Sequence, residues 1–241
     1  MQMKPLSVVN EAFLVYLDSF LDKGIGCPAA LLKLLKEAVQ RRLENTYFIP
    51  LRDEELPPHL QPTAKKWRKL AQVLGYRGNR PIAWLFRGGF TLKRAPLVGP
   101  CLGHIFQGLS SIPNEPTKES IVFWIPKLIP DSMGKTVAEK RIVLGKLRVR
   151  VDLPSHHLQS FGNVTLLAGL SLGYFAETGE CIPVDPSEAA SETFVDDRCF
   201  VIGFDNRGLI VGQWNFNDPH YERASHIGCF PFAIEELETS D

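Results

Sequence analysis

One apolar segment, VTLLAGLSLGYFA at residues 164–176, restricts the fold more than any other part of the chain. It contains no charged side chain, and a helix that is apolar on all sides has to be enclosed by other elements. Asn163 before the segment and Gly179 just beyond it are typical of residues that begin and end a helix. Gly169 and Gly173, four residues apart, would let another element approach the helix backbone closely. The sequence therefore predicts a buried helix over residues 163–177.

Most of the other apolar residues lie in short runs that are typical of strands. The clearest is CFVIGFDNRGLIVGQWNF at 199–216, which predicts a hairpin around the turn at 205–208. The other predicted strands are PIAWLF at 81–86, joined through RGG to FTLK at 90–93, then SIVFWIPKLI at 120–129, KLRVRVD at 146–152 and IGCFPFAI at 227–234.

Two of these runs carry further expectations. Pro126 lies inside the run at 120–129 and favours an edge strand or a bulge. The run at 146–152 alternates, so its apolar residues are expected on one face of a strand and Lys146, Arg148 and Arg150 on the other.

The chain is expected to divide into three parts. Residues 1–49 are predicted to form a helical hairpin, and residues 50–62, with four prolines, a connector. Residues 63–241 would form an α+β body with an acidic C-terminal segment, opened by a helix from a Thr63 cap to Gly75. The predicted fold class is α+β, with the helical hairpin packed on or linked to a mostly antiparallel sheet and one buried helix.

Composition indicates an ordinary globular protein. The 241 residues are 44% apolar and 22% charged, and no apolar run approaches the roughly 18 residues that span a bilayer. The five cysteines are odd in number and widely spread, which argues against a disulfide framework. The first residues lack the layout of a secretory signal. We therefore expect a cytoplasmic protein without membrane contact.

Charge is distributed unevenly along a chain whose net charge is zero. Residues 56–114 carry 9 basic and no acidic side chains, whereas residues 177–241 carry 3 basic and 14 acidic ones. The basic residues of the first segment are interleaved with aromatic residues, and together these are the ingredients of single-strand nucleic-acid binding. The nine are Lys65, Lys66, Arg68, Lys69, Arg77, Arg80, Arg87, Lys93 and Arg94.

This charge asymmetry is also compatible with two roles that involve no nucleic acid. The acidic C-terminal segment could fold against the basic segment and neutralise it, which a pI of about 7 favours. Alternatively, the two poles could serve a partner protein or head-to-tail self-association.

Three constellations resemble chemical sites only in part. PDSMGKT at 130–136 ends like a phosphate-binding loop but has isoleucine and proline where that loop needs glycine and a free amide. Cys101 and His104 could combine with His226 and Cys229 in a zinc site, but 121 residues separate the two pairs, and no zinc is expected. His156 and His157 are expected to be solvated loop residues.

The sequence thus favours an interaction protein that acts through protein–protein contacts or self-association and needs no cofactor. The first alternative is nucleic-acid or other polyanion binding through residues 65–94. The second is an enzyme of unrecognised type that uses Cys101 and His104, although no third group is evident to orient the histidine.

Overall fold

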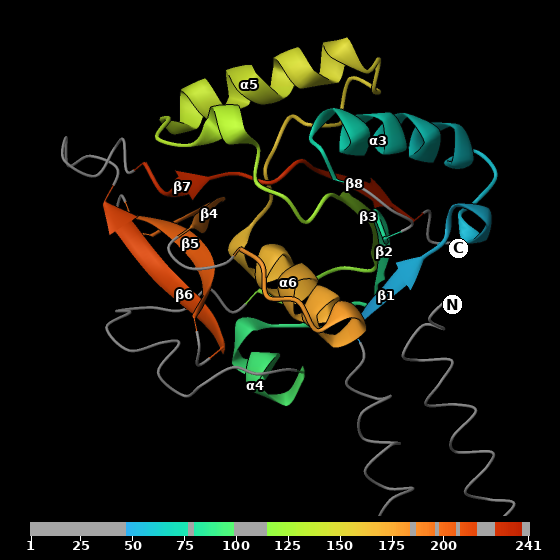
Figure 1. Cartoon of the computed structure of the whole chain (residues 1–241). Coiled ribbons are helices and arrows are strands. Elements are labelled where there is room, and N and C mark those ends of the chain that lie inside the picture. Colours follow the sequence, from blue (N-terminus) through green and yellow to red (C-terminus); the bar gives the residue numbers. More distant parts are fainter. Residues whose placement is uncertain are drawn as a thin grey trace, which may run out of the picture.

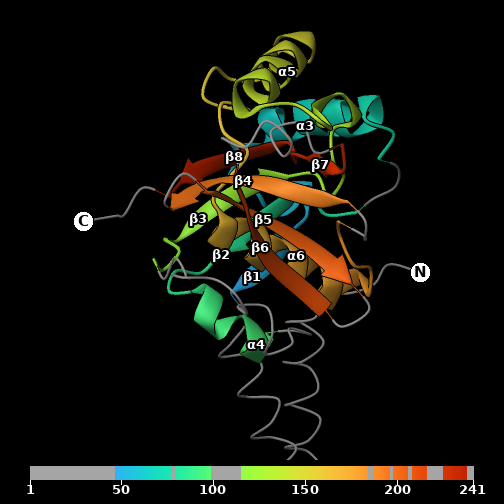
Figure 2. The same ribbon diagram turned by 90° about the vertical axis from the view of Figure 1, so that its left-hand side faces the viewer.

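The computed structural model describes residues 47–76, 80–98, 115–183, 187–195, 198–205, 208–215 and 225–237. Within them, helices and two four-stranded sheets pack together (Figures 1 and 2). Short 3-10 helices are labelled η. The elements in chain order are β1 (Phe48–Leu51), η1 (Asp53–Glu55), α3 (Gln61–Val73), β2 (Ala83–Phe86), η2 (Leu92–Arg94), α4 (Ala95–Val98), β3 (Ser120–Trp124), η3 (Pro130–Ser132), α5 (Val137–Arg150), α6 (Val164–Thr178), β4 (Glu188–Val195), β5 (Arg198–Asp205), β6 (Gly208–Asn215), β7 (Ile227–Gly228) and β8 (Phe232–Glu236).

The predicted α+β class is confirmed, and both sheets are mainly antiparallel. The first sheet has the order β1-β2-β3-β8 with every pair antiparallel, and Val122 of β3 lies between Trp84 and Ile234. The second has the order β6-β5-β4-β7, in which only β4 and β7 run parallel. The helical hairpin expected at 1–49 lies almost entirely outside the described residues, and β1 occupies its expected boundary with the connector.

Helix α6 lies between the two sheets, as its composition requires (Figure 1). Every residue from Val164 to Tyr174 is buried. The Asn163 side chain caps the helix by accepting the Leu166 N–H at 2.8 Å, and Gly179 ends it in the left-handed conformation at φ +74°. The prediction of a buried helix here is confirmed.

The two glycines of α6 accommodate the aromatic ring of Phe48 from β1. A Cβ atom built at Gly169 would lie 2.3 Å from the ring, and one at Gly173 would lie 2.8 Å from the Phe48 Cβ. The ring cannot move aside easily, since it packs edge-on against Phe86 and Phe90 at centroid distances of 4.7 and 4.8 Å. The close approach predicted from the glycine spacing is therefore made by β1.

Strand β3 is covered on both faces, which explains its continuous apolar sequence. Val122 and Trp124 belong to the core around α6. Ile121 and Phe123 point to the opposite side, where the core includes Trp67 of α3. Since β3 lies between β2 and β8 and ends before Pro126, the expectation of an edge strand or a bulge was wrong.

The strand predicted at 146–152 was also wrong, because residues 146–150 form the end of α5 and residues 151–152 follow it in a turn. Thr136 and Glu139 form a capping box that starts this helix, with the Thr136 side chain accepting the Glu139 N–H at 3.2 Å. The buried positions Lys140 and Leu144 are four residues apart, as in a helix and not in a strand. The alternation at 146–152 spans less than two helical turns and does not outweigh this capping signal.

Two smaller expectations were corrected in the same way. Residues 92–94 form η2 instead of the second strand of a hairpin, and the antiparallel neighbours of β2 are β1 and β3. Helix α3 begins at Gln61 with Pro62 in its first turn, so Thr63 is not its cap. The hairpin of β5 and β6 is confirmed, with Asp205 opposite Gly208.

We predict that Gly169→Ala destabilises the fold by about 1–3 kcal/mol, because the added methyl group overlaps the fixed ring of Phe48. Gly145→Ala in α5 is the matched control. A Cβ there meets no atom within 4 Å, so this change should stabilise the fold by about 0.5–1 kcal/mol. Urea unfolding of the two variants measures both free energies. Equal effects would contradict the packing of Phe48 against α6.

Candidate functional site

The nine basic residues singled out in the sequence do not form one patch. Lys65 and Lys69 are exposed on α3, and the Lys66 ammonium lies 2.8 Å from Asp152. Arg87 and Lys93 are exposed near η2, and Figures 1 and 2 place α3 and the following helix α4 on opposite sides of the sheets. Arg77 lies outside the described residues.

Three of the arginines are held by internal contacts. Arg68 binds the Asp53 carboxylate at 2.8 and 3.2 Å and donates to the Arg80 carbonyl at 2.6 Å. The Arg80 guanidinium contacts both oxygens of Glu180 and donates to the Tyr174 hydroxyl at 2.6 Å. Hydrogen bonds from Arg80 lower the pKa of Glu180. Arg94 donates to the hydroxyl of Tyr47 at 2.6 Å.

The aromatic residues between these cations are mostly part of the core. Trp67, Trp84, Phe86 and Phe90 have no exposed surface. Base stacking requires an aromatic face that a nucleotide can reach. These four side chains do not offer one, so the cations of this segment lack the stacking partners that the sequence pattern implied.

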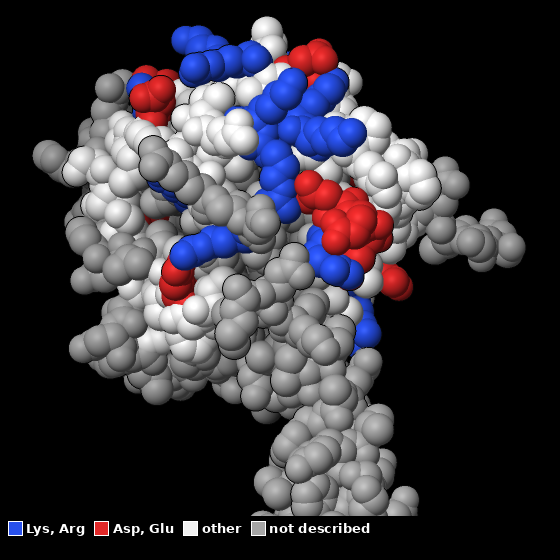
Figure 3. Space-filling view, turned by 45° about the vertical axis from the view of Figure 1, so that its right-hand side comes forward, with Lys and Arg blue, Asp and Glu red and all other residues white. Residues whose placement is uncertain are grey.

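A second group of cations lies on α5, beside α3. Figure 3 shows Lys and Arg side chains gathering over the upper part of the molecule, where Figure 1 places both helices, with Asp and Glu among and below them. Helix α5 buries only Lys140 and Leu144. Its opposite side presents Ile142, Lys146, Val149 and Arg150, which we call the α5 face. Ile142 is 58% exposed and Val149 is 75% exposed.

A groove of about 350 Å³ runs along one flank of the α5 face. Ile142, Val143 and Leu147 supply its apolar lining. The charged side chains that line it are Asp131, Lys135, Glu139, Lys146 and Arg150. Glu139 is already engaged at the start of the helix, where its Oε2 accepts the Thr136 N–H at 2.9 Å. The groove therefore combines apolar contact with exposed positive charge.

Several described carboxylates of the acidic C-terminal segment contact the body of the protein. Glu180 pairs with Arg80, and Glu192 lies 3.0 Å from Nε of Arg141. Glu235 contacts two histidines of the loop after α5. The ion pairs of Lys66 and Arg68, by contrast, are made with Asp152 and Asp53, which precede the acidic segment.

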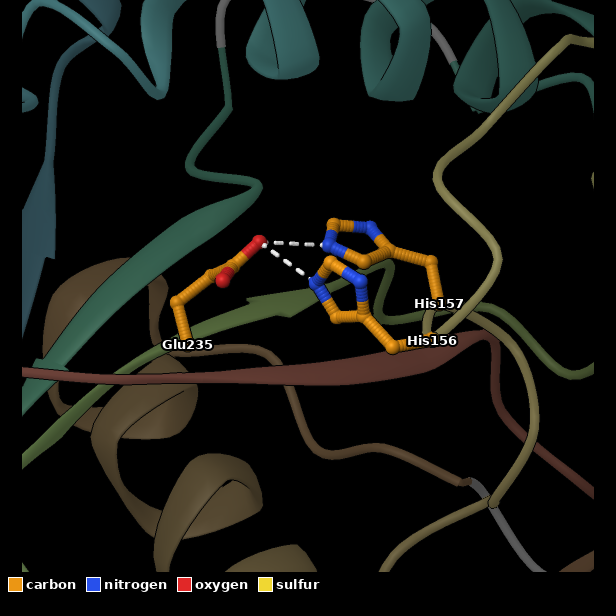
Figure 4. A group of neighbouring side chains, drawn as sticks. All are labelled: His156, His157 and Glu235. Atoms are coloured by element: carbon orange, nitrogen blue, oxygen red, sulfur yellow. Dashed lines mark hydrogen bonds and ion pairs between the residues drawn. The ribbon is translucent and has the colours of Figure 1, made fainter.

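His156, His157 and Glu235 form a cluster where the loop after α5 meets β8 (Figure 4). Oε1 of Glu235 lies 2.6 Å from Nε2 of His157 and 3.1 Å from Nε2 of His156. The His157 side chain is fully buried, whereas that of His156 is 55% exposed. The expectation of two solvated histidines was wrong for His157, because Trp67 and Phe123 enclose its ring.

The contact with Trp67 fixes the proton on the His157 ring. The indole N–H of Trp67 lies 2.8 Å from Nδ1 of His157, and an indole nitrogen only donates. Nδ1 must therefore accept, so the proton of the neutral ring is on Nε2 and is donated to Glu235. A chain of hydrogen bonds thus joins α3, the loop after α5 and β8.

This tautomer disfavours a metal ion shared by the three side chains, although their ligand atoms lie within 4.8 Å of one another. A metal bound to Nε2 of His157 would require a proton on Nδ1. Two N–H groups would then face each other where Trp67 now donates. We interpret the cluster as a proton-linked contact that fastens the loop to β8.

The other groups considered as ligands or nucleophiles are not brought together. Cys101 and His104 lie outside the described residues. Burial raises the pKa of the Cys229 thiol to about 11 and that of Cys199 to about 12. His226 lies 3.8 Å from Glu188. Among the described residues, neither His226 nor Cys229 belongs to a group of three metal-ligating side chains.

Sequence reasoning missed the buried lysine of α5. Lys140 is 1% exposed, donates from Nζ to the Lys135 carbonyl, and has a pKa that burial lowers. The sequence signal for its burial was its position four residues before the apolar Leu144, since this spacing places both side chains on one face of a helix. The motif PDSMGKT at 130–136 also belongs to the start of this helix, because its threonine, Thr136, is the residue that caps α5.

Comparisons with protein families, with curated proteins and with solved structures gave no match. The geometry of the described residues is therefore the only basis for a function. In the described part of the chain, no helix has both the length and the apolar character needed to cross a membrane.

We predict that NMR will find the His157 proton on Nε2, with Nδ1 unprotonated. Long-range ¹H–¹⁵N correlation spectra of the protein at neutral pH distinguish the two tautomers. Trp67→Phe removes the donor and leaves Nδ1 buried without a partner, which should cost about 1–3 kcal/mol of unfolding free energy. A proton on Nδ1 in the wild-type protein would contradict the hydrogen-bond chain.

We also predict an acid-sensitive stability that depends on His157. Burial lowers the pKa of His157 below its usual 6.5, although the hydrogen bond with Glu235 opposes the shift. As pH falls through the unfolded-state pKa, the unfolded chain takes up the proton first. Stability should then fall by at most about 1.4 kcal/mol per pH unit.

His157→Gln should remove this part of the pH dependence, and His156→Gln, which changes the exposed neighbour, should retain it. Urea unfolding between pH 5 and 8 provides the comparison. If the wild type and His157→Gln lose stability in parallel, His157 does not carry the effect.

Proposed function

We propose that the chain is a cytoplasmic interaction protein that binds a protein partner through the α5 face and the adjoining groove. The observation that supports this most is the exposure of Ile142 and Val149 on a helix that buries only two of its own side chains. Exposed apolar side chains that lie together beside a groove and are rimmed by polar residues are typical of protein contact sites.

The flanking cations support an interaction role without catalysis. Lys146 and Arg150 flank the apolar side chains, and such charges steer a partner and select its orientation. The histidine cluster holds the loop that follows α5, so it contributes to the position of this helix. An enzyme that uses Cys101 and His104 remains a separate prediction, since both residues lie outside the described part of the chain.

Electrostatic nucleic-acid binding is a second candidate, supported by the exposed Lys65 and Lys69 on α3. Without accessible aromatic faces, such binding would rest on phosphate contacts. Its affinity would then fall steeply with salt and would be insensitive to base sequence.

Site-specific photo-crosslinking tests the interaction surface. A photoreactive amino acid is placed at position 142, 149 or 73 in the cells that produce the protein. Val73 is the matched control, because it is an exposed valine (41%) on the neighbouring helix α3. We expect a discrete adduct from positions 142 and 149 and none from 73.

The crosslinked protein is then identified, purified and used in a binding measurement. Val149→Asp should weaken its affinity at least about tenfold, equivalent to about 1.4 kcal/mol, while Val73→Asp leaves it unchanged. The proposal fails if all three positions give the same adduct, or if the two aspartate variants weaken binding equally.

A further inference from the structure

The groove beside the α5 face has the dimensions of a site for side chains from a docked segment. Its volume of about 350 Å³ lies at the lower end of the range for ligand pockets. Ile142, Val143 and Leu147 lie at successive positions along one flank of α5, as in a surface that receives apolar side chains from a second helix.

The charge around the groove selects an acidic occupant. Three cations, Lys135, Lys146 and Arg150, lie at the groove against two carboxylates, Asp131 and Glu139, and that of Glu139 is engaged in capping the helix. Helix α3, which lies beside α5 in Figure 1, has no acidic residue and exposes Lys65 and Lys69. The cations outnumber the carboxylates, so the groove favours a segment that carries carboxylates over one that carries lysine or arginine.

Three alternative occupants fit these observations less well. A symmetric dimer through the α5 face would place the cations of one copy against those of the other. A membrane surface is flat, and the α5 face has no aromatic side chain of the kind that anchors interfacial helices. Nucleic acid would gain nothing from Ile142 and Val149, which cannot contact phosphate favourably.

Resting on the proposed function, we infer that the partner segment is an acidic amphipathic helix. Its apolar side chains pack against Ile142, Val143 and Leu147, and its carboxylates pair with Lys135, Lys146 and Arg150. Lys140 and Leu144, the buried residues of α5, attach the opposite side of the helix to the body of the protein.

Fluorescence anisotropy with synthetic peptides tests the inference on the full chain. The probe is a peptide of about 20 residues with leucines at helical spacing on one face and glutamates on the other. Its controls have the leucines changed to serine, or the glutamates changed to lysine. We expect saturable micromolar binding of the acidic leucine peptide alone, with affinity falling as salt rises.

Protein variants locate the contact. Ile142→Asp should weaken binding at least about tenfold, and Val73→Asp on α3 should not change it. Lys146→Glu should weaken binding of the glutamate peptide and improve binding of the lysine peptide. Circular dichroism and urea unfolding confirm that each variant is folded, so loss of binding is not loss of structure.

The results that would overturn the acidic-helix inference differ from those that would overturn the proposed interaction surface. The inference is overturned if the lysine peptide, single-stranded RNA or vesicles of anionic lipid bind in place of the acidic peptide. It is also overturned if sedimentation shows a dimer that Val149→Asp dissociates. If the acidic peptide fails while crosslinks at 142 and 149 persist, the acidic-helix inference falls and the interaction surface stands.

Discussion

The contact of Phe48 with the two glycines of α6 determines how the two sheets are assembled. Helix α6 is apolar on every side and needs cover from both sheets. Gly169 and Gly173 allow β1 to lie directly against its backbone on one side, while Phe200, Ile202 and Val211 of β5 and β6 belong to the same core. The first sheet is then free to use its other face, where Trp67 of α3 packs. Leu144 of α5 belongs to the same outer core, and Arg141 of α5 pairs with Glu192 of β4 in the second sheet. The candidate interaction surface therefore rests on a layer that α6 holds in place.

The sequence was informative where one local signal decided the structure. Asn163, the charge-free segment after it and Gly179 all indicate the same buried helix, and two apolar runs around a turn indicate the hairpin of β5 and β6. At 146–152 two signals competed. Alternation favoured a strand, but the capping box at Thr136 and Glu139 had already started a helix. The fold class could be predicted, whereas the order of strands in each sheet could not, since it depends on long-range pairing.

The candidate site was harder to predict, because burial decides what each side chain does. Arg68 and Arg80 lie in the same acid-free basic segment as Lys65. Unlike Lys65, both arginines are held in internal ion pairs. His157 follows His156 directly, and only the packing of Trp67 and Phe123 separates a buried ring from an exposed one. Nothing in the local sequence indicates that Glu235, 78 positions later, lies against both histidines. The α5 face could not be identified from the sequence, because residues 146–152 were predicted to form a strand and not part of a helix.

The position of β8 in the first sheet has a consequence for synthesis of the chain on the ribosome. Strand β3 is apolar and fully buried, and it pairs on one side with β2 and on the other with β8. Residues 232–236 are made long after β3, so the β8-facing edge of β3 stays open while more than 100 intervening residues are translated. During that interval the nascent chain exposes an unpaired apolar strand, the kind of edge to which aggregation partners and chaperones attach. The first sheet is complete only once β8 has been made and has paired with β3.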